Sequence, residues 1–288
     1  MEREQELAII RRAYAKQILA QVQVDNSRLE QAFAEVHRED FLGPGPWVIP
    51  RWLGEYVRTP SADPVYLYID SVVQIIAERH LNNGQPSGLA KWMASAPIRP
   101  GDHVVHIGTG TGYYTAIMSH LAGPSGKVTG IEVDTGLATR AKKNLSSYSN
   151  VRIVEGDGTT VPFDPADVIY VNAGVTRPAD QWLDGLREGG RLILPLATIK
   201  LMADDDTKVH SRGAMFRIER RASEFLAQVL SPVAIIPCDG ARDETSEAAL
   251  AEAFKKGDCK RVTRLYRNED IPDDRCWLRA SGWCLAYD

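Results

Sequence analysis

The sequence predicts an α/β fold in which helices cover a doubly wound, mainly parallel sheet of seven strands. Three observations lead to this fold class. A buried strand at 103–107 runs into a glycine-rich turn and a helix start. Further strand-like runs at 127–133, 151–154, 167–171 and 191–195 alternate with helical or turn sequences. Several of these runs end in polar side chains. Such alternation implies parallel strands joined by right-handed crossovers.

Two amphipathic helices are expected before the sheet. Apolar residues recur at helical spacing over 2–24, and again from Leu29 to Val36 after a capping sequence at 25–27. Residues 41–70 are rich in proline, glycine and aromatic residues. This segment suits either a loop fastened to the core by aromatic side chains or an aromatic lid over the active site.

The second half of the chain completes the sheet in this prediction. A helix is expected at 178–186, a turn at 188–190, and the last two strands at 214–218 and 233–237, joined by a helix around 223–229. The last of these strands is expected to be antiparallel. The tail adds a helix at 246–256 and a strand at 283–287. Three parts follow: N-terminal helices and aromatic loop at 1–80, a cofactor domain at 81–240 and a C-terminal extension at 241–288.

Composition excludes some functions. The chain has 34 basic and 38 acidic residues and a net charge of -4, so no overall field attracts nucleic acid or an anionic membrane. Its four cysteines lack C-x-x-C spacing, which predicts free thiols and no metal site. No apolar run approaches the roughly 20 residues of a membrane span. We therefore expect a cytoplasmic protein.

The glycine turn predicts which cofactor the fold binds. Its glycines are Gly108, Gly110 and Gly112, whereas dinucleotide sites use a G-x-G-x-x-G spacing. The G-x-G-x-G pattern is typical of sites for S-adenosylmethionine (SAM), so we expect Thr109 and Tyr113 to contact this cofactor together with the three glycines. The alternative is that the glycines serve only a tight turn between strand and helix.

Polar residues at the ends of successive strands extend the predicted site. Glu132 ends the second strand and is expected to accept hydrogen bonds from the ribose hydroxyls, with Val133 beside it. Asp157 and Gly158 follow the third strand and are expected at the adenine. Asn172 ends the fourth strand, where it could face either the cofactor or the substrate.

Three motifs resemble the protein-L-isoaspartate O-methyltransferase family: the glycine turn at 108–113, the triplet at 156–158 and the run at 188–195. That family also carries Thr-Ile-Ser before a Gln-Pro, and Gln85-Pro86 lies at about the matching distance. The resemblance covers roughly residues 25–200. It implies a SAM-binding α/β fold whose members methylate the carboxylate of damaged or isomerised aspartyl residues.

The chain departs from the family pattern at two places. Asn82 and Gly84 stand where the family has its Thr and Ser, so the hydroxyls are lost. The amides of Asn82, Asn83 and Gln85, with the hydroxyl of Ser87, could bind the carboxylate of SAM or of the substrate, or could simply form a turn.

His106 replaces the acid usual in the family's first strand. It could contact the methionine end of SAM or be a core histidine. The candidate catalytic residues are Asn82, Asn83, Gln85 and Asn172.

The resemblance and the chemistry of SAM together predict a protein or peptide carboxyl O-methyltransferase. A carboxylate is already ionised at pH 7, so its methylation needs no general base. The expected partner is therefore a peptide or protein. Two alternatives remain: a tRNA or small-molecule methyltransferase on the same fold, and a SAM-binding protein without activity. The basic stretch at 255–267 could be a solvated face or a nucleic-acid site.

Overall fold

The computed structural model describes residues 2–50, 55–198 and 213–288, and these divide into two compact units. The first unit comprises Met1–Gly101, Thr109–Gly130 and Asp134–Ile153. The second unit comprises Asp102–Gly108, Ile131–Val133 and Val154–Asp288. The predicted three-part division of the chain stays a prediction.

The sheet has ten strands in the order β13-β14-β12-β11-β10-β9-β8-β5-β6-β7. Their bounds are β5 His103–Ile107, β6 Lys127–Glu132, β7 Val151–Glu155, β8 Ala166–Val171, β9 Leu186–Ala197, β10 Gly213–Arg221, β11 Glu224–Pro232, β12 Arg264–Arg267, β13 Cys276–Ala280 and β14 Trp283–Ala286. The strands β5, β8 and β9 pair in parallel, and β9, β10 and β11 pair antiparallel. The predicted fold class is confirmed, and the sheet extends beyond the seven strands expected.

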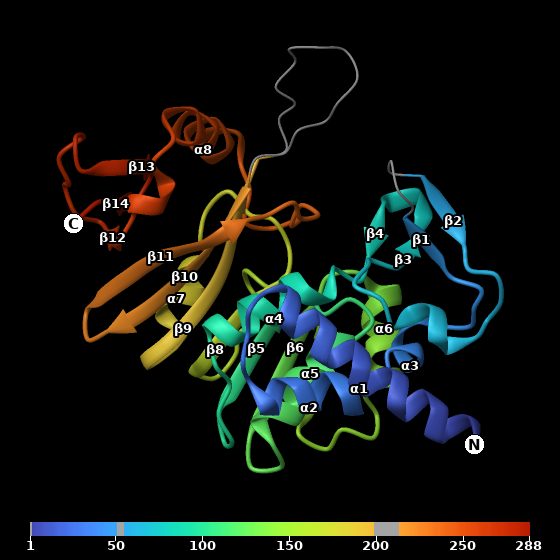
Figure 1. The fold of residues 1–288 in the computed structure, drawn as a ribbon. Helices are drawn as coiled ribbons and strands as arrows, with labels where there is room; N and C mark the ends of the chain where they lie inside the picture. Colours follow the sequence, from blue (N-terminus) through green and yellow to red (C-terminus); the bar gives the residue numbers. More distant parts are fainter. Residues whose placement is uncertain (1, 51–54, 199–212) are drawn as a thin grey trace. The chain divides into compact units, whose positions relative to one another are not determined.

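Helices pack together in the first unit, where α1 contacts α2 and α4, and α2 contacts α5 (Figure 1). The helices of this unit are α1 Arg3–Gln21, α2 Ser27–Glu35, α3 Glu39–Leu42, α4 Pro86–Ser95, α5 Tyr113–Ala122 and α6 Thr135–Asn144. The side chain of Asn26 caps α2 by accepting a hydrogen bond from the backbone N–H of Leu29 at 3.0 Å. Both N-terminal helices are thus confirmed.

The described residues between α3 and α4 form short elements: β1 Val48–Pro50, β2 Tyr56–Arg58, the 3₁₀ turns Pro64–Leu67 and Ala77–Arg79, β3 Gln74–Ile76 and β4 Leu81–Asn82. Trp47 is buried in a small cluster with Leu42, Leu67 and Val73, and Tyr68 is buried as well. Trp52 lies outside the described residues. The buried aromatic side chains favour the first of the two interpretations, a loop fastened to the core.

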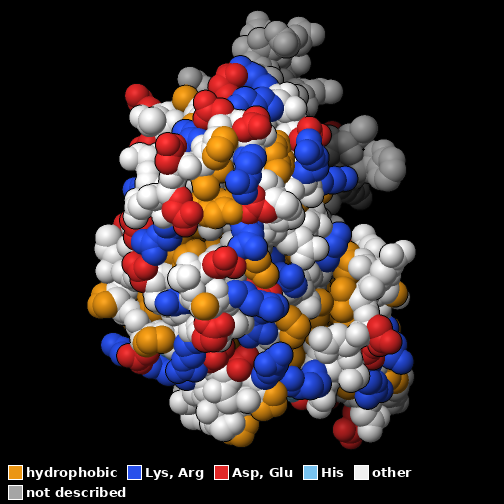
Figure 2. Space-filling view, turned by 90° about the vertical axis from the view of Figure 1, so that its left-hand side faces the viewer, with side chains coloured by type: hydrophobic (Ala, Val, Ile, Leu, Met, Phe, Trp, Pro, Cys, Tyr) orange, Lys and Arg blue, Asp and Glu red, His pale blue; other side chains and the backbone are white. Residues whose placement is uncertain are grey.

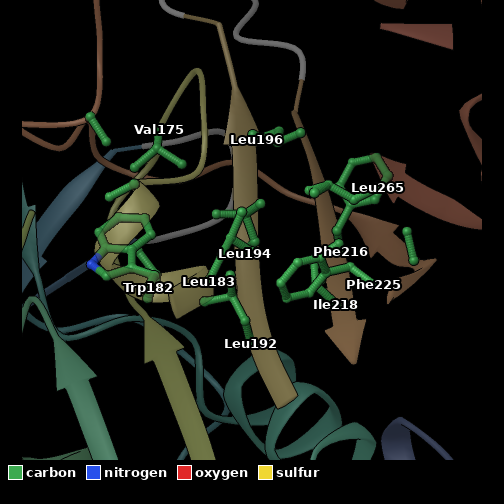
Figure 3. Packing of buried hydrophobic residues seen from close by; sticks show 14 of the residues in the cluster. Val175, Trp182, Leu183, Leu192, Leu194, Leu196, Phe216, Ile218, Phe225 and Leu265 are labelled. Atoms are coloured by element: carbon green, nitrogen blue, oxygen red, sulfur yellow. The ribbon is translucent and has the colours of Figure 1, made fainter. Parts of the chain in front are cut away.

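The apolar core of the second unit is formed by α7 Asp180–Asp184, the long strands β9, β10 and β11, and residues of the C-terminal part between 250 and 285 (Figure 3). Trp182 of α7 and residues of β9, β10 and β11 are buried there. The Trp182 indole also donates a hydrogen bond to the carbonyl of Gly158 at 2.7 Å. This core therefore fixes the turn that follows β7.

Three sequence predictions in this unit are wrong. Residues 223–229 form part of β11 rather than a helix, because a tight connection at Ala222, with φ of 53°, folds β11 back onto β10 along its length. Residues 188–190 lie within β9, where a register shift against β8 and the positive φ of Gly189 replace the expected turn. Residues 233–237 make isolated backbone contacts and no strand.

The cysteine prediction is also wrong for two of the four residues. Cys276 of β13 and Cys284 of β14 form a disulfide, while Cys238 and Cys259 are free thiols. The two strands pair antiparallel in a hairpin, which brings together cysteines that no short motif links. The tail also contains the 3₁₀ turn Cys259–Arg261 and the helix α8 Glu244–Lys256, which packs on β13. Over the part of the chain that is described, no helix is long and apolar enough to cross a membrane.

Candidate cofactor and acceptor site

In the second unit, the carboxyl ends of β5 and β8 meet at Gly108. The N–H of Gly108 donates to the carbonyl of Ile131 at 2.9 Å, and the N–H of Asn172 donates to the carbonyl of Ile107 at 2.8 Å. Gly108 has a φ of 77°, and a Cβ there would lie 3.3 Å from the carbonyl oxygen of Asn172. Position 108 therefore requires glycine, because the backbone has a positive φ and a neighbouring carbonyl leaves no room for a side chain.

Glu132 and Val133 lie next to this point, at the end of β6. The Glu132 carbonyl accepts a hydrogen bond from the N–H of Gly156 at 2.9 Å, which joins the end of β6 to the turn after β7. The Glu132 side chain is only 6% exposed, whereas Val133 is 47% exposed. An acid beside an exposed apolar side chain suits a nucleoside, because the ribose hydroxyls donate hydrogen bonds and the flat aromatic face of the base packs on apolar surface.

Asp157 and Gly158 form a rigid turn after β7. The Asp157 carboxylate accepts hydrogen bonds from the N–H of Thr159 at 2.8 Å and from its hydroxyl at 2.9 Å. A Cβ on Gly158 would overlap the side chain of Ile107, so this glycine is needed for close packing. The structure thus brings Gly108, Glu132, Asp157 and Asn172 to one edge of the second unit.

In the first unit, two glycines of the turn have different surroundings. Gly112 has a φ of 101°, and a Cβ there would lie 2.7 Å from Cδ1 of Leu145. Gly110 has a φ of 58°, and apart from its chain neighbours no atom of the described residues lies within 4 Å of a Cβ there. Gly112 is therefore required by packing within the protein, while Gly110 borders open space. The neighbouring Thr109 is buried.

Tyr113 begins α5, and its side chain points into the first unit rather than to its surface. It is fully buried, and the Arg38 guanidinium lies 5.9 Å from its ring centroid. Only the backbone of Tyr113 is therefore suited to touch a ligand. The next residue, Tyr114, donates from its hydroxyl to the carbonyl of Gly84 at 3.1 Å. This hydrogen bond fixes residues 82–87, which we call the amide-rich loop, against α5.

The amide side chains of that loop are engaged in local structure. Asn82 accepts a hydrogen bond from the N–H of Gly84 at 2.8 Å, closing a turn. Gln85 donates to Asp70 at 2.9 Å, and Ser87 donates to the same carboxylate from both its N–H and its hydroxyl. Asp70 thereby caps the N-terminus of α4, where a negative charge is favourable.

Asn83 is buried against an arginine that the sequence did not single out. Its Oδ1 accepts from the N–H of Val73 at 2.7 Å and from the guanidinium of Arg38 at 3.3 Å. Arg38 is fully buried and also donates to the carbonyls of Leu67, Ile69 and Ser71. The guanidinium thus joins the loop to the segment before β3. No sequence motif signalled this role of Arg38, which lies in the turn between α2 and α3, or the role of Asp70.

His106 lies in the core of the second unit. Its side chain is fully buried on β5, and its ring meets Tyr170 edge to face with centroids 5.8 Å apart. Burial lowers the pKa of His106 to about 3, so the imidazole is neutral at pH 7. Of the two interpretations, this position favours the core histidine.

Stability should depend on pH through His106. Its pKa falls from 6.5 to about 3 on folding, so the unfolded chain binds a proton in this window and the folded chain does not. The stability that the neutral His106 contributes is therefore fully present above pH 6.5. It is lost as the pH falls below 6.5, by up to about 1.4 kcal/mol for each pH unit. Between pH 7 and 5.5, urea unfolding should show the wild type losing about 1 kcal/mol more than His106→Gln. Equal losses in both proteins would show that His106 does not titrate this way.

Two further kinds of site, a metal centre and a basic surface, find little support among the described residues. Among the described residues, no group of three or more His, Cys, Asp or Glu side chains could hold a metal ion. In the basic stretch, Lys255, Arg264 and Arg267 form ion pairs with acidic neighbours. On the face in Figure 2, basic and acidic side chains are interspersed. These observations favour a solvated face over a nucleic-acid site.

The parallel strands β5, β8 and β9, with the glycine turn and the acid at the end of β6, define the fold of SAM-dependent methyltransferases. Two solved structures confirm this fold. A protein-L-isoaspartate O-methyltransferase matches with a TM-score of 0.65 and 28% identity, over 89% of this chain and 73% of that one. A protein-L-isoaspartate O-methyltransferase homologue from Plasmodium falciparum, in complex with S-adenosyl-L-homocysteine, matches with a TM-score of 0.60 and 16% identity, over 80% of this chain and 98% of that one.

The chain belongs to the protein-L-isoaspartate(D-aspartate) O-methyltransferase family, whose model matches residues 49–237. The enzyme of that name from Thermotoga maritima is 34% identical over 177 residues, 59% of this chain and 51% of the relative. The Ignicoccus hospitalis enzyme is 32% identical over 156 residues, 53% of this chain and 69% of the relative. The chain thus spans about half the length of the Thermotoga relative.

Proposed function

We propose that the protein is a SAM-dependent methyltransferase that esterifies a carboxylate of a protein or peptide. The observation that carries this proposal is the family match over residues 49–237. This range includes the glycine turn, the acids Glu132 and Asp157 after β6 and β7, and the amide-rich loop. The relatives reported above bear the name of an enzyme with this chemistry.

The residues present fit a SAM molecule. In the second unit, Gly108 lacks a side chain at a crowded strand end, Glu132 supplies a carboxylate for the ribose, and Val133 offers exposed apolar surface for the base. Asp157 and Gly158 would bind the adenine, and Asn172 a polar group of the cofactor or acceptor. In the first unit, Gly110 borders open space, and Thr109, Gly112 and the backbone of Tyr113 continue the turn. Bound SAM would supply a methyl group attached to a sulfonium sulfur. Once the methyl group is transferred, that sulfur is left as a neutral thioether.

The proposed acceptor is a carboxylate because the described site residues include no evident general base. His106 is buried and neutral, with a pKa of about 3 that leaves it a poor proton acceptor at pH 7. The remaining candidates, Asn82, Asn83, Gln85 and Asn172, carry amides that can donate hydrogen bonds but cannot remove a proton. An ionised carboxylate needs only to be oriented and shielded from water. Asn83 is buried against Arg38 and Gln85 donates to Asp70, so we propose Asn82 and Asn172 as the amides that orient the acceptor.

The acceptor should differ from the usual one of the family. Asn82 and Gly84 stand in place of the family's Thr and Ser, and Asn82 is engaged in closing the turn at Gly84. The hydroxyls that help hold an isoaspartyl carboxylate are therefore lost. We expect simple isoaspartyl peptides to be poor substrates.

The acceptor can be tested by the chemical stability of the product. Incubation with methyl-labelled SAM and peptides containing aspartate or isoaspartate should give label that mild base releases as methanol, because an ester hydrolyses and an N-methyl group does not. The Gly110→Val variant serves as the negative control. Base-stable label would refute carboxyl methylation. Labelling of RNA in the same assay would favour the alternative of a tRNA methyltransferase.

A further inference from the structure

A segment that runs across the end of the family match lies against the strand ends of the second unit. It comprises residues 235–242, and we call it the crossing segment. The N–H of Gly174 donates to Ile236 at 2.7 Å, and the N–H of Cys238 donates back to Gly174 at 2.8 Å. The N–H of Thr176 donates to the carbonyl of Ala241 at 3.0 Å. The crossing segment therefore pairs with the loop that begins at Asn172.

Arg242 fastens the end of the crossing segment. Its guanidinium donates to the carbonyl of Gly174 at 2.8 Å and to the carbonyl of Ala197 at 2.9 Å. It also forms an ion pair with Glu247 of α8, and both side chains are largely buried. A buried guanidinium with three partners holds the backbone in one position. The crossing segment is thus a fixed part of the second unit.

Gly240 packs directly on the carboxylate of Asp157. A Cβ at position 240 would overlap Oδ1 of Asp157 and lie 2.8 Å from Oδ2, closer than real Cβ atoms approach an oxygen. The backbone N–H and hydroxyl of Thr159 bind the same carboxylate at 2.8 Å and 2.9 Å. The orientation of the Asp157 side chain is therefore set by Thr159 together with Gly240.

We propose that Gly240 is a positioning residue for cofactor binding, because it holds the Asp157 carboxylate where it meets the adenine. This inference rests on the proposed function, which places Asp157 at the base of SAM. The family match ends at residue 237, so Gly240 and Arg242 lie outside the part that the family accounts for. The C-terminal part of this chain thereby contributes to recognition of the nucleoside.

A double-mutant cycle on S-adenosylhomocysteine affinity, measured by titration calorimetry, tests the inference. Asp157→Ala should weaken binding at least about 10-fold, as expected for loss of one hydrogen bond to a charged group, and Gly240→Ala should weaken it by less, about 5- to 10-fold. If Gly240 acts through the carboxylate, the double variant should bind within about twofold of Asp157→Ala alone. Asp239→Ala changes an exposed neighbour in the same segment and should bind like the wild type.

The same cycle on the free energy of unfolding guards against a purely structural effect. Removing the carboxylate also removes the clash, so Asp157→Ala should restore stability lost in Gly240→Ala. Affinity losses that multiply in the double variant would overturn the inference, and so would unchanged affinity in either single variant. Failure of the proposed function looks different, because the wild type itself would then not bind S-adenosylhomocysteine.

Discussion

Replacing Gly110 by valine should abolish binding of SAM while leaving the protein folded. The φ of 58° at Gly110 costs a branched residue about 1–2 kcal/mol, a tolerable loss for a domain of this size. Apart from its two chain neighbours, no atom of the described residues lies within 4 Å of a Cβ there, so the new side chain would extend into the space that we assign to the cofactor. Titration calorimetry should detect no binding, an affinity loss above about 100-fold, while circular dichroism stays native.

The matched control for this result is Gly112→Val, two residues along the same turn. A Cβ at position 112 would lie 2.7 Å from Leu145, and the φ is 101°, so this variant should lose several kcal/mol of stability. The two variants together separate a ligand effect from a folding effect. If Gly110→Val binds SAM as tightly as the wild type, the turn is not part of the cofactor site.

Replacing Glu132 by alanine should weaken SAM binding by about 10- to 150-fold. The proposed role of this carboxylate is to accept a hydrogen bond from a ribose hydroxyl, and a hydrogen bond to a charged group contributes about 1.5–3 kcal/mol. The side chain is only 6% exposed, so water replaces the lost contact poorly. Calorimetry on the purified variant, with a urea unfolding curve to confirm the fold, measures the change.

Two further variants make the Glu132 result specific. Glu132→Gln keeps the shape and a carbonyl acceptor but removes the charge, so its affinity should lie between those of the wild type and Glu132→Ala. Glu155→Ala removes an exposed acid at the end of β7 and should bind SAM normally. Unchanged affinity in a folded Glu132→Ala protein would remove this residue from the site.

Local patterns in the sequence predicted the elements that carry the site. The strand at 103–107, the glycine turn and the start of α5 lie where the alternation of apolar runs and glycines indicated. The N-terminal helices also followed from helical spacing and from the cap at Asn26. These features can be predicted from short stretches of sequence. The spacing of apolar residues, helix capping and the φ preference of each residue depend on neighbours within a few positions.

The predictions were wrong where contacts with residues far away in the sequence determine the local structure. β11 was predicted as a helix, but it pairs along its length with β10, so the tertiary partner overrode the local preference. The disulfide between Cys276 and Cys284 depends on how β13 and β14 pair, which their spacing does not reveal. A G-x-G-x-G motif likewise does not predict that Gly112 packs against Leu145 while Gly110 borders open space.

The sequence by itself determined the fold class, the glycine turn and the acids at the strand ends. Only the tertiary structure showed that Arg38 joins Asn83 to distant carbonyls, that Asp70 caps α4 from 17 residues away, and that Gly240 packs on Asp157. Each of these contacts joins residues far apart in the chain. Their partners are set by how the elements pack, and packing depends on the shapes of many side chains together rather than on any repeating pattern.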